Sequence, residues 1–245
     1  MLCILCMVVF LLAPTNGVAQ TKVYATGAVT TTATHTTGVP NAYDQNPATA
    51  AELPAYSGVI ALASPYSSNI ELSFPAELAA NTTTYVKIAT DEPNILNGLL
   101  GGSLGSVLST LLAGAQEFTV EVKNNAGTVV HSGQSQVAGD FNTAKLNIVV
   151  NASGEYLLRV TPDVPYKSIK FTNRYATLLG LGVTKRLYVY DAYYVTGIPV
   201  CLPDATYTST NGSGISATLL TNNTVGVVNP QNAIDTNPNN FSTLN

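Results

Sequence analysis

The chain has 245 residues, of which 46% are hydrophobic and only 10% are charged, and its formal net charge is −4. A disordered chain has the opposite composition, with low hydrophobicity and high charge, so a folded protein with a sizeable core is expected. The sequence has no cluster of Lys and Arg to neutralise phosphates, which argues against a nucleic-acid-binding protein.

The first twenty residues carry no charge, and residues 4–13 form a continuous apolar run. This run is too short to cross a bilayer, which takes about 20 residues. Because the small residues Gly17 and Ala19 follow it, we interpret residues 1–19 as a secretory signal peptide, with a buried N-terminal strand as the alternative. Cleavage after Ala19 leaves Cys201 as the one remaining cysteine, so no internal disulfide is expected in the secreted chain.

Alternation of apolar and polar residues predicts a series of short strands further along the chain. They are expected at residues 68–74, 84–89, 117–123, 128–131, 146–150, 155–161, 167–171 and 186–195. The turn residues 124–127 predict a hairpin between the third and fourth of these strands. Helices long enough to connect parallel strands are not visible, so the pattern predicts an all-β fold, either a sandwich or a barrel.

One apolar stretch interrupts this strand pattern. Residues 93–116 contain no charged side chain and many leucines, which raises the alternative of a transmembrane helix. Five glycines in the stretch and the amphipathic strands on both sides favour an apolar insertion, with a short helix near residues 106–113, that folds over one end of the β-core. Residues 176–183 have the same Leu/Gly-rich character. We therefore expect a protein that does not span the membrane.

An internal repeat determines the predicted domain organisation. Residues 41–53 and 232–244 share Asn, Ala, Asp, Asn, Pro and Leu at six of thirteen positions, without a gap and at an offset of 191 residues. This offset is too long for a solenoid repeat and suits tandem domains. We therefore predict one complete module at residues 20–199 and the start of a second, truncated copy at residues 200–245. Neighbouring copies of the module would then be partners within a longer chain.

The sequence of residues 41–49, Asn-Ala-Tyr-Asp-Gln-Asn-Pro-Ala-Thr, resembles the N-A-[VI]-D-G-[ND]-P-x-T signature of discoidin-like modules, also known as coagulation-factor type C or galactose-binding-like domains. Residues 187–197 resemble their final strand. The two ends together look like a variant found in tandem on very large secreted and cell-surface proteins of Bacteroidetes-type bacteria. The resemblance implies an antiparallel jelly-roll β-sandwich. Two departures are Gln45, where the family has Gly, and the absence of Trp from the chain.

The signature contains oxygen-bearing side chains that suit a calcium ion. Asp44, Asn46 and Thr49 lie within six residues of one another, and Ca²⁺ takes six to eight oxygen ligands. The resemblance implies a structural Ca²⁺ at this position, completed by an acidic residue of the last strand, here Asp191. The alternative is a plain Asx turn, in which Asp44 and Asn46 bond their own backbone ahead of Pro47.

Catalytic chemistry has little support in the sequence. His35 and His131 are expected to be solvated, and the sequence contains no nucleophile elbow and no zinc-binding motif. Tyr56 and Tyr66 flank a loop-rich stretch and are candidate ligand contacts, because tyrosine combines apolar area with a polar tip.

We therefore expect a non-catalytic adhesion or binding module, secreted or at the cell surface, that recognises a glycan or another surface component such as a protein. Two alternatives stay open. The chain could be a structural spacer in a tandem-domain surface protein, or an accessory module of a large secreted glycoside-active enzyme.

Overall fold

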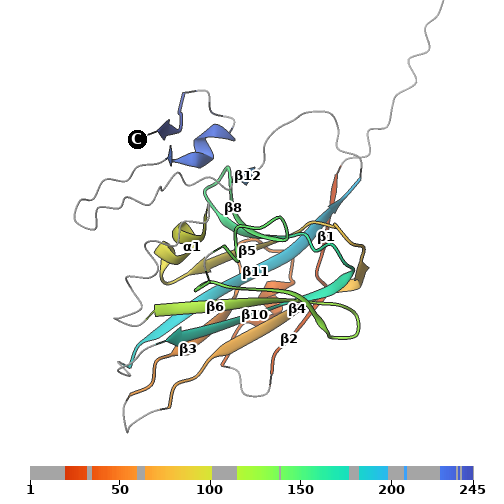
Figure 1. Ribbon diagram of the computed structural model, residues 1–245, viewed down its shortest axis with the longest axis vertical. Helices are drawn as coiled ribbons and strands as arrows, with labels where there is room; N and C mark the ends of the chain where they lie inside the picture. The colour runs from red at the N-terminus through yellow and green to blue at the C-terminus, as the bar shows by residue number, and fades with distance from the viewer. Residues whose placement is uncertain are drawn as a thin grey trace, which may run out of the picture.

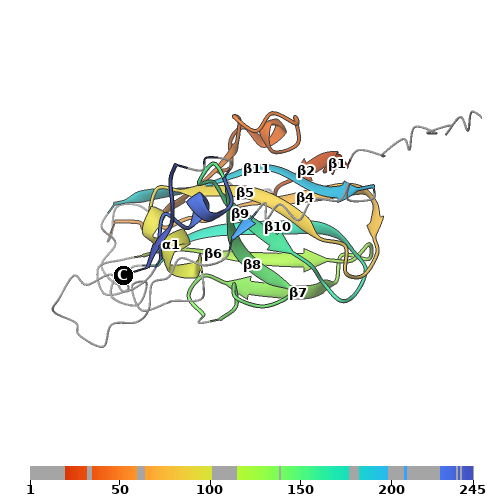
Figure 2. The ribbon, with the colours of Figure 1, turned by 90° about the horizontal axis from the view of Figure 1, so that it is seen from above.

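The computed structural model describes residues 20–31, 35–59, 64–100, 115–137, 139–176, 182–197, 207–208, 227–235, 237 and 239–244. These residues form two antiparallel β-sheets that pack face to face, as Figures 1 and 2 show from two directions. The predicted class, an all-β antiparallel sandwich, is confirmed. The signal peptide predicted at residues 1–19 lies outside the described residues.

The larger sheet has seven strands in the order β1-β11-β5-β9-β8-β12, and β3 also pairs with β11. Its strands are β1 (Thr21–Tyr24), β3 (Ala51–Tyr56), β5 (Thr84–Thr90), β8 (Leu146–Asn151), β9 (Tyr156–Val160), β11 (Thr184–Thr196) and β12 (Tyr207–Thr208). The smaller sheet has the order β2-β4-β10-β6-β7. Its strands are β2 (Gly27–Val29), β4 (Ser68–Leu78), β6 (Ala115–Lys123), β7 (Val129–Gln134) and β10 (Tyr166–Ala176).

The core lies between the two sheets and is formed by every second residue of their strands. In β4 the inward residues are Ile70, Leu72 and Phe74, and each is at most 1% exposed. Phe118 and Val120 of β6 are buried in the same way. Full burial of such a side chain contributes about 1.5–3 kcal/mol, so the alternation seen in the sequence is also what holds the layers together.

Strand β11 organises the larger sheet because three strands pair with it. β5 lies along one side of β11, while β1 and β3 share the other side. The pairing with β1 begins with Thr21 opposite Thr196, so the first strand and the last long strand of the sandwich meet at their ends. Between Val189 and Ala192 the register with β5 shifts, which marks a β-bulge at residues 190 and 191.

The apolar stretch begins with a short helix, α1 (Pro93–Leu99), whose first residue is a proline, as is common at helix starts. Ile95, Leu96 and Leu99 are buried in the core, so the helix covers part of the sandwich. The helix predicted near residues 106–113 lies outside the described residues. Among the helices that the structure describes, none has the length and hydropathy needed to cross a membrane.

Candidate functional site

The Asp44 corner, which we define as residues 38–50, leads from β2 into β3. It opens with the 3₁₀ helix η1 (Val39–Ala42), preceded by Gly38 at φ 64°, and η1 lies beside β11. The carboxylate of Asp44 accepts one hydrogen bond from the Asn46 amide at 2.9 Å and another from Thr49 Oγ1 at 2.8 Å. Asn46 Oδ1 accepts a third from the Ala48 amide at 3.1 Å. The three polar residues named from the sequence therefore form one hydrogen-bonded loop with two consecutive Asx turns.

Asp191 lies in the bulge of β11 and reaches the same corner, although it is 146 residues away from Gln45 in the chain. Bulges commonly redirect a side chain, and here the Gln45 amide donates to Asp191 Oδ1 at 3.0 Å. The residue is only 5% exposed, and within the described part of the chain its Oδ2 is buried with no hydrogen-bond partner.

The environment of Asp191 disfavours its ionised form. Burial raises the pKa of the Asp191 carboxyl above its ordinary value, and the negative charge of Asp44 acts in the same direction. The hydrogen bond from the Gln45 amide opposes this rise in the pKa. A buried carboxylate oxygen without a partner, close to a second carboxylate, has the chemistry that a bound cation would satisfy.

The repeat identified in the sequence is also a repeat of local structure. Residues 229–241 contain the 3₁₀ helix η4 (Pro230–Ala233), preceded by Asn229 at φ 53°, as η1 is preceded by Gly38 at φ 64°. The strands β13 (Val227–Val228) and β14 (Thr243–Leu244) flank this segment and pair with each other. In this pair Val228 lies opposite Thr243. The residues 191 positions earlier, Thr37 and Glu52, form an isolated β-bridge in the first copy.

The hydrogen bonds of the two copies agree as well. The carboxylate of Asp235 accepts from the Asn237 amide at 3.0 Å and from Asn240 Nδ2 at 2.7 Å, and Asn237 Oδ1 accepts from the Asn239 amide at 3.0 Å. Asn240 therefore replaces the hydroxyl donor Thr49. Sequence identity at these positions thus corresponds to one shared backbone shape.

The Asp44 corner contains the oxygen-bearing side chains of Asp44, Asn46 and Thr49, and Asp191 accepts from its Gln45 amide. Two carboxylates, an amide and a hydroxyl form a set of hard oxygen donors, which suits Ca²⁺ rather than a metal that prefers nitrogen or sulfur. Within the described residues no group of three or more His, Cys, Asp or Glu side chains is placed to hold a metal. A cation at the corner would therefore depend on neutral and backbone oxygens beside the two carboxylates.

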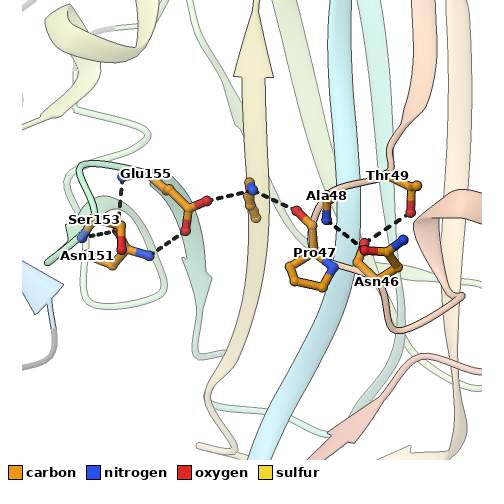
Figure 3. Close-up of polar contacts among 8 residues, drawn as sticks. Asn46, Pro47, Ala48, Thr49, Asn151, Ser153 and Glu155 are labelled. Carbon is orange, nitrogen blue, oxygen red and sulfur yellow. Dashed lines mark hydrogen bonds and ion pairs between the residues drawn. The ribbon is translucent and has the colours of Figure 1, made fainter.

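Lys87 of β5 connects the Asp44 corner to the β8–β9 hairpin; in Figure 3 it is the unlabelled side chain joined by dashed lines to Pro47 and Glu155. Its Nζ donates to the Pro47 carbonyl oxygen at 2.7 Å and to Glu155 Oε1 at 2.6 Å. Asn151 Nδ2 donates to the other oxygen of Glu155 at 2.8 Å, and Asn151 Oδ1 accepts from the Ser153 amide at 3.0 Å. The hydrogen bond from Lys87 lowers the pKa of the Glu155 carboxyl despite its partial burial. The sequence interpretation did not identify Lys87 or Glu155.

The structure also brings together the two candidate contact residues Tyr56 and Tyr66. Their backbones form an isolated β-bridge, and their rings stack with centroids 5.6 Å apart at an interplanar angle of 27°. His35 adds a third ring, 3.9 Å from that of Tyr66. His35 is exposed and both tyrosines are half-buried. We call these three residues the aromatic row; its histidine was not assigned a binding role from the sequence.

His131 of β7 differs from the sequence expectation of a solvated side chain. Its Nε2 is buried and has no hydrogen-bond partner in the part of the chain that the structure describes. Burial lowers the pKa of the imidazole, and the charge of Lys145 lowers it further. The charges of Asp163 and Asp140 oppose this lowering of the pKa. His131 lies on β7 in the smaller sheet, away from the Asp44 corner and the aromatic row.

Comparison with known proteins gives no match to a family model, to a curated protein or to a solved structure. The class that the fold defines is an antiparallel β-sandwich with one short helix. The finer resemblance to discoidin-like modules therefore rests on the residues of the Asp44 corner and of β11.

Proposed function

We propose that the chain is a non-catalytic binding module, of the discoidin-like jelly-roll type, from a secreted or cell-surface protein, and that it recognises a glycan. The observation that carries this proposal is the aromatic row of Tyr56, Tyr66 and His35. The three rings come from separate segments and contact one another. Tyr56 occupies an outward position of β3, and none of the three residues belongs to the core between the sheets.

The chemistry of the aromatic row suits a carbohydrate. Ring surfaces pack against the C–H faces of sugars, and the phenol and imidazole groups offer polar partners for hydroxyls. The rings are already stacked on one another, so little side-chain freedom remains to be lost on binding. A surface protein that displays similar groups would be a second partner of the same site.

We propose that the Asp44 corner binds a structural Ca²⁺. Asp44, Asn46, Thr49 and Asp191 would hold the ion, supported by the unpartnered buried oxygen of Asp191. When bound, the ion would neutralise two neighbouring carboxylates and tie the loop that precedes β3 to the bulge of β11. Its contribution is therefore to stability and loop placement rather than to a reaction.

A structural spacer is the second candidate function, and the repeated corner favours it. If residues 200–245 begin a second module, the protein contains sandwiches in series, and such an array can extend a distant binding or catalytic domain from a surface. An accessory role beside a glycoside-active enzyme fits the same organisation. Binding of a glycan distinguishes the first proposal from a spacer.

A glycan array probed with the purified protein tests the proposed binding. Tyr66→Ala removes the middle ring of the aromatic row and is expected to reduce binding to the preferred glycan at least tenfold, since an aromatic contact residue commonly contributes more than 1 kcal/mol. Tyr85→Ala, in β5 and outside the row, is the matched control and should bind as the unmodified protein does. Absence of binding to any glycan by the unmodified protein would favour the spacer.

Calcium is tested by calorimetric titration and by thermal unfolding with and without chelator. We expect Ca²⁺ to raise the melting temperature of the unmodified protein, because a ligand that binds only the folded state stabilises it. Asp191→Asn should remove that response, while Asp163→Asn, in an exposed ion pair with Lys145, should retain it. An unmodified protein that shows neither heat of binding nor a shift in melting temperature would contradict the calcium proposal.

A further inference from the structure

We propose that Lys87 is the positioning residue of the Asp44 corner: it holds the loop and the bulge of β11 in the arrangement that the cation site requires. This inference rests on the proposed calcium site and adds a residue to it that is not itself a ligand. Lys87 points outward from β5, since its neighbours Val86 and Ile88 are buried in the core. In the β5–β11 register it lies opposite residues 190 and 191, the bulge that carries Asp191.

Lys87 contacts both parts that supply the oxygen donors. Its ammonium donates to the carbonyl of Pro47, which lies between Asn46 and Thr49 in the loop. The same ammonium lies 4.3 Å from the ring centroid of Tyr190, the residue next to Asp191 in the bulge. The Lys87 side chain therefore fixes the Asp44 corner against β11. A second link between them is the hydrogen bond from the Gln45 amide to Asp191.

A positive charge beside a cation site would normally weaken cation binding. Here the ammonium is 2.6 Å from Glu155 Oε1, so the pair is close to neutral as a unit. The amide of Asn151 holds the second oxygen of Glu155 and keeps that carboxylate directed at Lys87 (Figure 3). The β8–β9 hairpin thus supplies the counter-charge that allows a lysine to serve as a support for a metal loop.

The inference is tested by Lys87→Met, which retains most of the aliphatic stem, and by Lys87→Arg, which retains the donors. We expect Lys87→Met to weaken Ca²⁺ binding about tenfold or more, as loss of an outer support of a metal site commonly does. Lys87→Arg should restore most of the affinity. Lys123→Met is the matched control: Lys123 also lies 2.6 Å from a glutamate, Glu71, but in the other sheet, and its loss should leave Ca²⁺ binding unchanged.

A second measurement needs no metal. Hydrogen exchange at the amides of Asn46, Ala48 and Thr49 in chelator should be faster in Lys87→Met than in Lys123→Met, because these amides bond within the loop that Lys87 holds. Equal exchange in the two variants would overturn the inference, as would unchanged calcium affinity in Lys87→Met. If the unmodified protein binds no Ca²⁺, the calcium proposal fails, and the exchange rates alone decide the role of Lys87.

Discussion

Gln45 shows how a single residue can occupy a conformation that its side chain disfavours. Its φ of 64° lies in the left-handed region, which favours glycine, and glycine is the residue that the discoidin-like signature carries at this position. The conformation is useful because it directs the Gln45 amide to Asp191. A glutamine here adopts this conformation at a cost of about 1 kcal/mol in conformational energy.

We therefore expect Gln45→Gly to stabilise the protein by about 0.5–1 kcal/mol, measured as the free energy of unfolding in urea. The matched control is Gln134→Gly in β7, where the backbone is extended, and there a loss of about 0.5–1 kcal/mol is expected. A stabilisation by both substitutions, or by neither, would contradict the role assigned to the positive φ.

Glu71 on β4 predicts a pH dependence of stability. Burial alone would raise its pKa, but hydrogen bonds from Lys123 and Ser168 and the charges of Lys123 and Lys170 together lower it. A carboxyl with a lowered pKa in the folded state contributes stability above its ordinary pKa, and this contribution is lost as the pH falls through the lowered value.

Glu71→Gln should accordingly reduce the free energy of unfolding by about 1 kcal/mol at neutral pH, and the difference from the unmodified protein should shrink between pH 5 and pH 3. Chemical unfolding of both proteins across this range measures the effect. A difference that stays constant with pH would show that the loss comes from packing rather than from the charge.

At the scale of elements, Asn173 joins the two layers of the sandwich. This fully buried residue of β10 donates to the carbonyls of Leu53 in β3 at 2.6 Å and of Lys185 in β11 at 2.9 Å, and it accepts from Gln116 in β6. Its side chain therefore bonds across the interface between the sheets, as do Tyr166 with Thr84 and Ser68 with the Pro54 carbonyl.

Asn173→Ala removes three buried hydrogen bonds, those to the carbonyls of Leu53 and Lys185 and that from the Gln116 amide. We expect it to cost about 3 kcal/mol of unfolding free energy. Asn125→Ala, in the exposed β6–β7 turn, should change the stability by less than about 0.5 kcal/mol. Thermal or urea unfolding followed by circular dichroism distinguishes the two variants. Equal effects would show that the bonds between the layers contribute little.

The elements that sequence reasoning predicted are those with large side chains in alternation. β6 was predicted because Phe118, Val120 and Val122 share one face, and the same holds for β4 and β11. β3 was not predicted because its inward residues include Ala51 and Ala55, which carry a weak apolar signal, and because Pro54 interrupts it. A proline is tolerated there, since β3 pairs with β11 alone among the described strands.

At the scale of the whole molecule, the Asp44 corner could be found from the sequence because its residues occur a second time at residues 232–244. Asp191 was named only through the resemblance of β11 to a final strand. Lys87 could not be found in the sequence, since its partners Pro47 and Glu155 are 40 and 68 residues away and are brought together only by strand pairing. The aromatic row likewise depends on a bridge that joins distant segments.

The meeting of β1 and β11 at their ends has a mechanical consequence. Thr21 pairs with Thr196, so tension applied at Gln20 and Gly197 opens the β1–β11 pairing one hydrogen bond at a time. Tension applied at Gln20 and Thr184 instead loads the same pairing in shear. We expect force spectroscopy with handles at the first pair of sites to show a first rupture at lower force than handles at the second pair, and equal forces would contradict this geometry.

If such sandwiches stand in series between a cell and its target, each would respond to drag by first releasing β1. The load would then pass to the hydrogen bond from the Ala25 amide to the Ala192 carbonyl. It would next reach the bond from the Thr26 amide to the Ser73 carbonyl and the pairing of β2 with β4 in the opposite layer. The array would lengthen in small steps, one for each β1 that is released. Extension of a row of these modules would thus lower the peak force that a sudden pull places on a weak attachment.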